Sequence, residues 1–350
     1  MKRRLSKEIS IGNVKIGGNN PISVQSMCNT DTRDVTSTLK QINEMADLNC
    51  DIVRLAVLNS DAAEALKEIV KKSPLPIVAD IHFDYRLAIQ SINSGVSALR
   101  LNPGNIGKRE NVEKVTKLAK QQNIPIRIGV NAGSLEKNLL EMDIPLPEKM
   151  VLSALGHIKI LEECNFDLIK VSLKSSDVMT TIEAYRSIAD KCIYPLHLGV
   201  TEAGTLRGGL IKSSAGIGTL LAEGIGDTIR VSLTENPVEE VSAGIDILKS
   251  LGLRKQGVNF ISCPTCGRTQ IDLIKLAKKV EEKFKNLDIP ITIATMGCAV
   301  NGPGEARHAD FGIAGGIGEG YIFRKGEIIA RVPEDKLLEK LEEVIVKSIK

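Results

Sequence analysis

Short apolar runs alternate along the chain with longer segments in which apolar residues recur every three or four positions, as on one face of a helix. The short runs predict eight strands, at residues 22–27, 52–57, 77–81, 98–101, 126–130, 168–173, 196–200 and 228–233. The longer segments predict helices at residues 34–48, 61–72, 108–122, 148–164, 178–190 and 237–250. Alternating strands and helices form parallel βαβ units, and eight units favour a (β/α)8 TIM barrel. An open doubly wound sheet is the alternative. Residues 9–18 are expected to form a hairpin that caps the barrel floor.

The pattern changes after about residue 255. The stretch ISCPTCGRT precedes a helix predicted near 270–285. Strands are predicted at 291–296, near 309–314 and near 321–330, before a terminal helix at 333–348. Frequent glycines in this region indicate tight turns and close backbone approach. We therefore expect an α/β chain of two domains, a barrel over residues 1–255 and a small α+β domain over residues 256–350.

Composition removes several classes of function. The chain has 350 residues and a net charge of +3, too small to indicate a nucleic-acid or membrane partner. No apolar run is long enough for a transmembrane helix, and the basic start MKRRLSKEISIG lacks the apolar core of a signal peptide. Aromatic residues make up 3% of the chain, which argues against a base-stacking surface. Seven cysteines without an extracellular disulfide pattern favour the reducing cytoplasm, and Cys28, Cys50, Cys164 and Cys192 are expected to be buried small hydrophobes.

Basic residues interrupt the predicted strands. Side chains two apart on a strand share a face, and one face of each strand is Val, Leu or Ile. The opposite, inner face carries Arg54, Arg100, Arg127, Lys170 and Arg230. The same parity places Asp80 with His82 toward the carboxyl end of a strand, where barrel active sites are built.

Five cations cannot neutralise one another, and Asp80 and Glu202 compensate them only in part. Burying an unpaired charge costs on the order of several kcal/mol. The pattern therefore predicts an anion with more than one charge, and arginine forks suit phosphate, so the expected ligand is a phosphorylated small molecule. Internal salt bridges are the alternative for any single cation. Lys174 is either a phosphate ligand or a solvated surface lysine. His82 and His197 are expected to be packing or hydrogen-bonding groups rather than metal ligands, although His82, beside Asp80, could orient substrate or move a proton.

The tail holds a second set of chemical groups. Cys263 and Cys266 form a CPTC motif, and Cys298 follows in a glycine-rich turn. With His308 they would make a zinc ribbon of three thiolates and one imidazole. The alternative is an iron–sulfur cluster held by three thiolates, with Glu305 as an oxygen ligand or with an open iron. Spacing alone leaves both open, and a redox centre beside an anion site favours the cluster.

The motifs also resemble a known family. The tail segments CPTCGRT and MGCAVNGPGEA are similar to those of the 4-hydroxy-3-methylbut-2-en-1-yl diphosphate synthases, the GcpE/IspG family of the non-mevalonate isoprenoid pathway. The barrel segments ISVQSM, ADIHFD, LRLNPGNIG, RIGVNAGSL, LHLGVTEAG and GIGDTIRVSLTENP resemble that family too. The resemblance covers essentially the whole chain, is most specific in the tail, and fits the compact two-domain bacterial form.

The resemblance implies an iron–sulfur oxidoreductase. Such an enzyme reductively opens 2-C-methyl-D-erythritol 2,4-cyclodiphosphate to the linear allylic diphosphate, with electrons that pass through a [4Fe–4S] cluster from flavodoxin or ferredoxin. It further implies a homodimer in which the tail of one subunit covers the barrel of the other. The implied cluster ligands are Cys263, Cys266, Cys298 and Glu305, and Glu305 can be displaced by substrate. The implied diphosphate ligands are Arg54, Arg100, Arg127, Asn131, Lys174 and Ser232. Asp80, His82 and Glu202 match acid–base and hydroxyl-binding positions. Strand parity adds Lys170 and Arg230.

Two other functions compete with this one. The first is a non-redox barrel transferase that acts on a phosphorylated substrate, similar to dihydropteroate synthases, with a structural zinc tail. The second is a binding module whose zinc ribbon contacts nucleic acid, against which the low aromatic content and weak net charge count. Iron, sulfide and zinc contents distinguish the three.

Overall fold

The computed structural model describes residues 2–285, 287–298, 304 and 306–349. The chain divides into two compact units, Met1–Arg254 and Lys255–Lys350. Each unit has its own hydrophobic core. Among the described residues, no helix combines the length and the hydropathy that crossing a bilayer requires.

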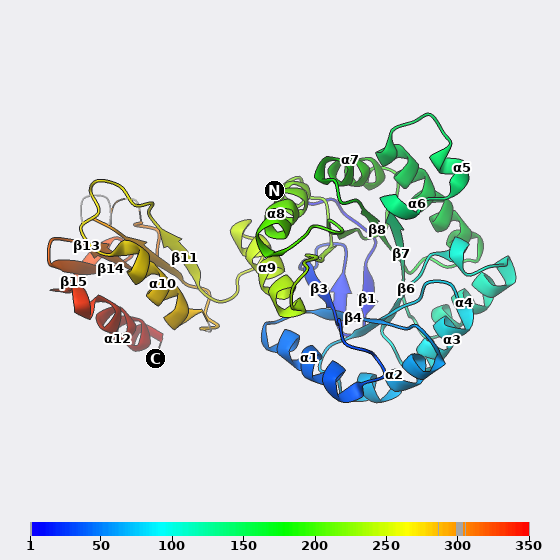
Figure 1. Ribbon diagram of the computed structural model, residues 1–350, viewed down its shortest axis with the longest axis horizontal. Coiled ribbons are helices and arrows are strands. Elements are labelled where there is room, and N and C mark those ends of the chain that lie inside the picture. Colours follow the sequence, from blue (N-terminus) through cyan, green and yellow to red (C-terminus); the bar gives the residue numbers. More distant parts are fainter. Residues whose placement is uncertain (1, 286, 299–303, 305, 350) are drawn as a thin grey trace. The chain divides into compact units, whose positions relative to one another are not determined.

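The first unit is a barrel of eight parallel strands surrounded by helices (Figure 1). The strands are β3 (Ser23–Met27), β4 (Ile52–Ala56), β5 (Ile77–Asp80), β6 (Ala98–Arg100), β7 (Ile126–Asn131), β8 (Ile169–Lys174), β9 (His197–Leu198) and β10 (Thr228–Ile229). They pair in the order β8-β7-β6-β5-β4-β3-β10-β9, and a parallel bridge between Val171 and Leu196 joins the two ends. The TIM barrel is confirmed, and the open doubly wound sheet is wrong.

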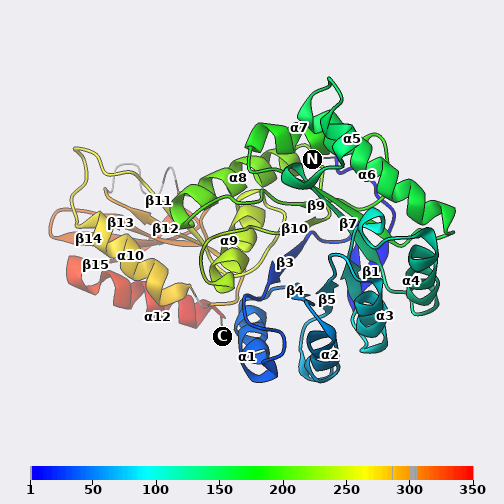
Figure 2. The same ribbon diagram turned by 45° about the vertical axis from the view of Figure 1, so that its right-hand side comes forward.

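The outer helices are α1 (Val35–Asp47), α2 (Ser60–Lys72), α3 (Tyr85–Asn93), α4 (Arg109–Gln121), α6 (Leu146–Glu163), α7 (Val178–Ala189), α8 (Leu206–Ala222) and α9 (Pro237–Ser250), with the short α5 (Lys137–Leu140) before α6. The turned view in Figure 2 separates α1, α2, α3 and α4 along one side of the barrel. Helices α3 and α8 were not predicted: α3 is short, and the glycines and serines of LRGGLIKSSAGIGTLLA obscure the apolar period of α8.

Side-chain caps begin many of these helices. The carboxylates or amides of Asp34, Asn59, Asp84, Asp177 and Asn236 accept a hydrogen bond from a backbone N–H in the first turn of α1, α2, α3, α7 and α9. Each such cap stabilises a helix by about 1 kcal/mol. The caps lie at the ends of the loops that follow the strands, so they also fix the loops that surround the barrel mouth.

The floor of the barrel is apolar. Strands β1 (Ile9–Ile11) and β2 (Val14–Ile16) form an antiparallel hairpin. Its Ile9, Ile11 and Ile16 pack against Ile52, Val78 and Ala98 from three barrel strands. The predicted hairpin cap is confirmed. Because apolar side chains fill this end, the inward polar side chains lie nearer the carboxyl ends of the strands.

The second unit is a mixed five-stranded sheet with two helices. Its strands are β11 (Asn259–Ser262), β12 (Thr292–Met296), β13 (Phe311–Gly315), β14 (Glu319–Arg324) and β15 (Glu327–Pro333), in that order. The first three are parallel, and β14 and β15 run antiparallel to their neighbours. The single strand predicted near 321–330 is wrong, because a turn at Lys325 and Gly326, both with positive φ, divides it into β14 and β15. Strand β11 was not predicted.

The two faces of this sheet bury different residues. On one face, helices α10 (Leu273–Phe284) and α12 (Leu337–Ile349) pack on large side chains such as Ile293, Ile313 and Ile322. On the other face, Ala294, Met296, Ala314 and Phe323 pack with Ala306 and Ala309, and Cys263 contacts this cluster. Cys263 thus contacts the face of the sheet opposite the one on which α10 and α12 pack.

Candidate active site

Asp80, the last residue of β5, is the centre of an inward-facing ion cluster in the barrel. Its Oδ2 lies 3.8 Å from Arg54 Nε and 3.3 Å from His82 Nε2, and its Oδ1 lies 3.5 Å from Arg100 Nη1. Burial alone would raise the pKa of the Asp80 carboxyl, but Arg54, His82 and Arg100 together hold that pKa below its usual range. Asp80 is therefore ionised at neutral pH. The strand parity that predicted this shared inner face is confirmed.

Arg127 and Lys170 are more fully buried than Arg100, and neither forms an ion pair with a carboxylate of the described residues. They pair in register across β7 and β8, and Lys170 is 2% exposed. Arg127 Nη1 donates to the hydroxyl of Ser172. Among the described residues, Arg127 Nε, Arg127 Nη2 and Lys170 Nζ are buried without a hydrogen-bond partner. Native interiors rarely leave such groups unpaired, and these N–H groups can donate to an anion or to ordered water.

The pKa values of these buried cations fall. Burial lowers the pKa of the Lys170 amine, the nearby Arg127 lowers it further, and Asp227 opposes this only in part. Burial also lowers the pKa of Arg127 and brings that of Arg54 to about 10. The barrel interior thus carries more positive charge than its own carboxylates stabilise, and a bound polyanion would relieve this.

Lys174 closes the cluster at the carboxyl end of β8. It is 6% exposed, and burial lowers the pKa of its amine, so the alternative of a solvated surface lysine is wrong. A Cβ on Gly199 would lie 2.7 Å from Lys174 Nζ. Likewise, a Cβ on Gly129 would lie 2.8 Å from Arg100 Nε. These two glycines leave the space through which long cationic side chains reach the barrel interior.

The remaining predicted residues surround the mouth. Asn131 ends β7 and pairs in register with Lys174. Ser232, partly buried, follows β10, and a hydrogen bond from Thr234 N to Gly204 O joins its loop to the loop that carries Glu202. Glu202 is exposed, has a left-handed backbone (φ 52°), and is not among the described residues whose side chains meet in the cluster. The side chain of His82 is 53% exposed.

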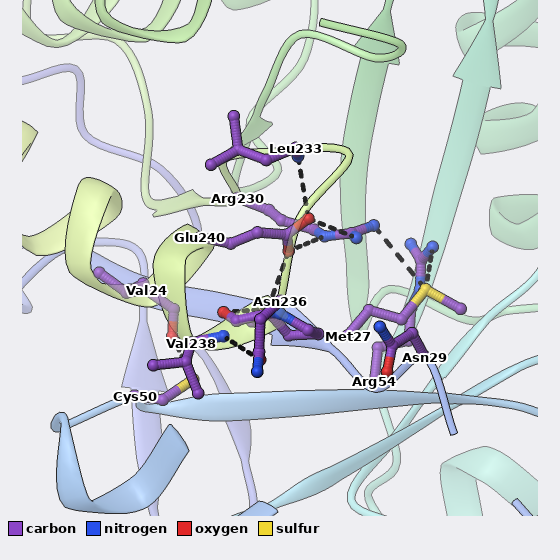
Figure 3. A network of polar contacts seen from close by, with 12 residues as sticks. Val24, Met27, Asn29, Cys50, Arg54, Arg230, Leu233, Asn236, Val238 and Glu240 are labelled. Atoms are coloured by element: carbon purple, nitrogen blue, oxygen red, sulfur yellow. Dashed lines mark hydrogen bonds and ion pairs between the residues drawn. The ribbon is translucent and has the colours of Figure 1, made fainter. Parts of the chain in front are cut away.

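Arg230 is not a free cation. Its Nε and Nη2 lie 3.2 Å and 3.3 Å from the two carboxylate oxygens of Glu240, a buried residue of α9 (Figure 3). The internal salt bridge considered as an alternative is therefore correct for Arg230, and the contacts with Asp80 make it correct for Arg54 and Arg100 as well. His197, predicted as a packing or hydrogen-bonding group, is buried and its Nδ1 lies 2.7 Å from Thr228 Oγ1.

The tail cysteines gather near the ends of β11 and β12. The amide N–H of Gly297, next to Cys298, donates to the sulfur of Cys263 at 3.1 Å. Gln270 N donates to Gly297 O, and Thr269 is hydrogen-bonded to the backbone of Cys266, so the CPTC loop is tied to the turn before Cys298. A backbone N–H from Arg268 lowers the pKa of the Cys266 thiol. Amide donors to sulfur and a lowered thiol pKa both suit thiolate ligands of a cluster.

No group of three metal-ligating side chains is assembled in the part of the chain that the structure describes. Glu305, the predicted fourth ligand, lies outside the described residues. His308, the fourth ligand of the zinc alternative, is exposed, and its Nε2 accepts from its neighbour Arg307.

Comparison with known proteins decides the family. Residues 6–245 match the model for the GcpE TIM-barrel domain, and residues 259–347 match that for the GcpE protein C-terminal domain. The chain belongs to the GcpE family. It is 61% identical over 346 residues to the 4-hydroxy-3-methylbut-2-en-1-yl diphosphate synthase (flavodoxin) of Clostridium perfringens, covering 99% of both chains. It is 57% identical over 348 residues to the enzyme of the same name from Geobacter sulfurreducens, covering 98% of this chain and 99% of the relative.

Solved structures show how common the barrel of this GcpE-family chain is. Dihydropteroate synthase of Yersinia pestis matches with a TM-score of 0.51 and 11% identity, covering 70% of this chain and 98% of the other. The 3-dehydroquinate dehydratase of Geobacillus kaustophilus matches with a TM-score of 0.50 and 15% identity, covering 71% and 99%. Such identities show the fold alone. The likeness to dihydropteroate synthase therefore extends to the barrel fold only. The family models place the chain in the GcpE family and not among the transferases considered from the sequence.

Sequence reasoning missed Glu240 in this GcpE-family chain. A glutamate in the first turns of a helix usually indicates the favourable interaction with the helix dipole, and ENPVEEV offers two of them. The helical period of α9 could have predicted the burial of Glu240. Glu240, Gly244 and Ile247 recur at intervals of four and three residues, which places them on one face of the helix, and all three are buried.

Proposed function

We propose that this chain reductively opens 2-C-methyl-D-erythritol 2,4-cyclodiphosphate to 4-hydroxy-3-methylbut-2-enyl diphosphate in the non-mevalonate isoprenoid pathway. The reaction takes up two electrons and releases water, with protons balancing the charge. Full-length relatives named for this product support the proposal. The observation in the molecule that carries it is the set of buried barrel cations, Arg127, Lys170 and Lys174, whose pKa values are lowered first by burial and then by repulsion from neighbouring arginines.

The barrel binds the cyclic diphosphate in this proposal. Planar guanidinium forks at Arg54, Arg100 and Arg127 match phosphate oxygens, and Lys174 supplies a point charge. Asn131 and Ser232 contribute neutral hydrogen-bonding groups near the mouth. Lys170, which is 2% exposed, contributes a further positive charge, and Arg230, paired with Glu240 through Nε and Nη2, contributes its Nη1 group. Together these residues orient the substrate and stabilise its diphosphate, which is the share of the work a protein contributes to cofactor chemistry.

The proposal gives separate roles in hydrogen bonding and proton transfer to Asp80, His82 and Glu202. Because Arg54, His82 and Arg100 stabilise its ionised form against the cost of burial, Asp80 accepts a hydrogen bond from a substrate hydroxyl and is unsuited to act as an acid. His82 lies 3.3 Å from Asp80 with its ring half in solvent, so it can exchange a proton with water. Glu202 belongs to an exposed loop with a strained backbone conformation, and we assign it the exchange of a proton with bound substrate.

The second unit holds the redox group in this proposal. Cys263, Cys266 and Cys298 would ligate a [4Fe–4S] cluster, with Glu305 as the exchangeable fourth ligand. Such a cluster would supply electrons one at a time and a Lewis-acidic iron. Flavodoxin, which the relatives' names mention, or ferredoxin delivers the electrons. We further propose a homodimer in the cytoplasm, where reducing conditions keep the seven free cysteines available.

The test is anaerobic purification followed by metal analysis and turnover. About four irons per chain with matching sulfide, and conversion of the cyclic diphosphate by a reduced donor, are expected. Stoichiometric zinc without iron would reject the redox function and return the tail to the zinc-ribbon alternative.

A further inference from the structure

A polar network joins helix α9 to the cations of the barrel. Glu240 is 4% exposed, and each of its two carboxylate oxygens accepts two hydrogen bonds. Oε2 accepts from Ser26 Oγ at 2.9 Å and from Arg230 Nε at 3.2 Å. Oε1 accepts from Arg230 Nη2 at 3.3 Å and from the backbone N–H of Leu233 at 3.1 Å. One carboxylate thus fixes a strand β3 side chain, a guanidinium and a loop backbone.

The network continues through a sulfur atom. Met27 Sδ lies 3.0 Å from Arg54 Nε and 2.8 Å from Arg54 Nη2, and it lies 3.7 Å from Arg230 Nη1. Figure 3 shows the sulfur between the two guanidinium groups, with Glu240 on the far side of Arg230. A thioether is a weak acceptor, so these contacts orient the cations without neutralising them. The Nη1 end of Arg230 therefore stays available to an anion.

We propose that Glu240 is a positioning residue of the anion site, which fixes both the Arg230 fork and the loop that carries Ser232 for a phosphate group. This inference rests on the proposed function in naming a diphosphate as the ligand. Leu233 directly follows Ser232, so the bond from Leu233 N to Glu240 restrains the backbone that presents the Ser232 hydroxyl. Ordering the site before the ligand arrives lowers the entropic cost of binding.

Two effects of Glu240 on an anion have opposite signs. As a negative charge near a cationic site, Glu240 repels a diphosphate, and removing the charge alone would tighten binding. As the group that orients Arg230 and the loop, it favours binding, and removing it would weaken binding. The direction in which anion affinity changes when the charge of Glu240 is removed therefore distinguishes a positioning role from simple electrostatic repulsion.

The experiment compares Glu240→Gln with Glu239→Gln in the anaerobically purified full chain. Glu239 lies next to Glu240 on the same helix but is not buried, so the control removes the same charge without touching the network. Titration calorimetry with inorganic pyrophosphate should show affinity about tenfold weaker for Glu240→Gln, the size expected for loss of charge-assisted bonds, and unchanged affinity for Glu239→Gln. In turnover, KM should rise about tenfold while kcat changes less than about twofold.

Further variants keep the test decisive. Glu240→Asp retains the charge but shortens the reach, so it should show a smaller loss in the same direction even where Glu240→Gln folds poorly. In an Arg230→Met background, Glu240→Gln should weaken pyrophosphate binding by a smaller factor, because one of its two targets, the Arg230 fork, is gone and only the bond to Leu233 N remains. Pyrophosphate affinity that is equal or tighter in folded Glu240→Gln and Glu240→Asp would overturn the proposal. So would a fall in kcat alone at constant KM. Lack of cyclic-diphosphate turnover by the wild-type chain would count against the proposed function, and the pyrophosphate comparison would still decide the role of Glu240.

Discussion

Lys170 lies beside Arg127 in register across β7 and β8, and the amine of Lys170 is buried with no hydrogen-bond partner among the described residues. Two neighbouring cations in a barrel interior are costly for the empty protein. Such a loss of folding stability is expected at a site that binds a polyanion, because residues that serve binding commonly reduce the stability of the ligand-free protein.

The first prediction concerns the stability of the ligand-free chain. Lys170→Met replaces a buried, unpaired amine with an apolar side chain of similar length, so the free energy of unfolding should rise by about 1–3 kcal/mol. Chemical denaturation monitored by circular dichroism measures it. Lys159→Met, at an exposed position on α6, is the control and should change stability by less than about 0.5 kcal/mol. A clear loss of stability in Lys170→Met would mean that the amine is paired in the ligand-free protein.

The second prediction is a pH dependence carried by Lys170. The unfolded chain holds the lysine proton up to a pKa of about 10.4, whereas burial lowers the pKa in the folded barrel. Between the two pKa values the unfolded state binds more protons, so this lysine makes the folded state more stable as pH rises through that window. The stability advantage of Lys170→Met over wild type should therefore shrink as pH rises from about 7 to about 10. An advantage that stays constant over this range would show that Lys170 titrates normally.

The third prediction concerns the space that Gly199 provides. A Cβ there would lie 2.7 Å from both Lys174 Nζ and the carbonyl oxygen of Arg230, so Gly199→Ala must displace Lys174. Pyrophosphate binding should weaken about tenfold, as expected when one charge-assisted contact is lost. Gly218→Ala is the matched control, because a Cβ at this position in α8 meets nothing within 4 Å. Equal affinity in Gly199→Ala and wild type would remove Lys174 from the anion site.

Much of the barrel could be predicted from the sequence because strands have a strict period of two. That period is sufficient to place Arg54, Arg100 and Lys170 on the inner face of the barrel. Contacts that come from outside a strand, such as Glu240 on Arg230, depend on how α9 packs and carry only a weak periodic signal. Likewise, the burial of Lys174 depends on the absence of a side chain at Gly199, from a distant part of the chain.

Element lengths were predicted less well for physical reasons. Strands β9 and β10 keep only two residues each in regular pairing, although the apolar runs there are longer, because hydrophobicity predicts burial and not hydrogen bonding. In the tail, the Lys325–Gly326 turn divides the stretch 321–330, which is predicted from the sequence as one strand. The ligand set of the cysteines came from a family resemblance, because spacing alone could not separate zinc from a cluster.

The fourth prediction concerns the tail. Cys266→Ser should lose most of its iron, because the Cys266 thiol, whose pKa a backbone N–H of Arg268 lowers, would be a cluster ligand. Its pyrophosphate affinity should stay within about twofold of wild type, since the buried cations belong to the other unit. Cys164→Ser removes a thiol from the barrel unit and should keep its iron. Full iron content in Cys266→Ser would exclude Cys266 as a ligand.

In the proposed function, the buried cations of the barrel bind the diphosphate of the substrate. Arg127 Nε and Nη2 are buried without partners among the described residues, so the most direct test is titration calorimetry of the cyclic diphosphate into wild type and Arg127→Met. Removing one charge-assisted phosphate contact should weaken binding about tenfold to a hundredfold, while the folded variant keeps or gains thermal stability. Unchanged affinity in a folded Arg127→Met chain would contradict the account.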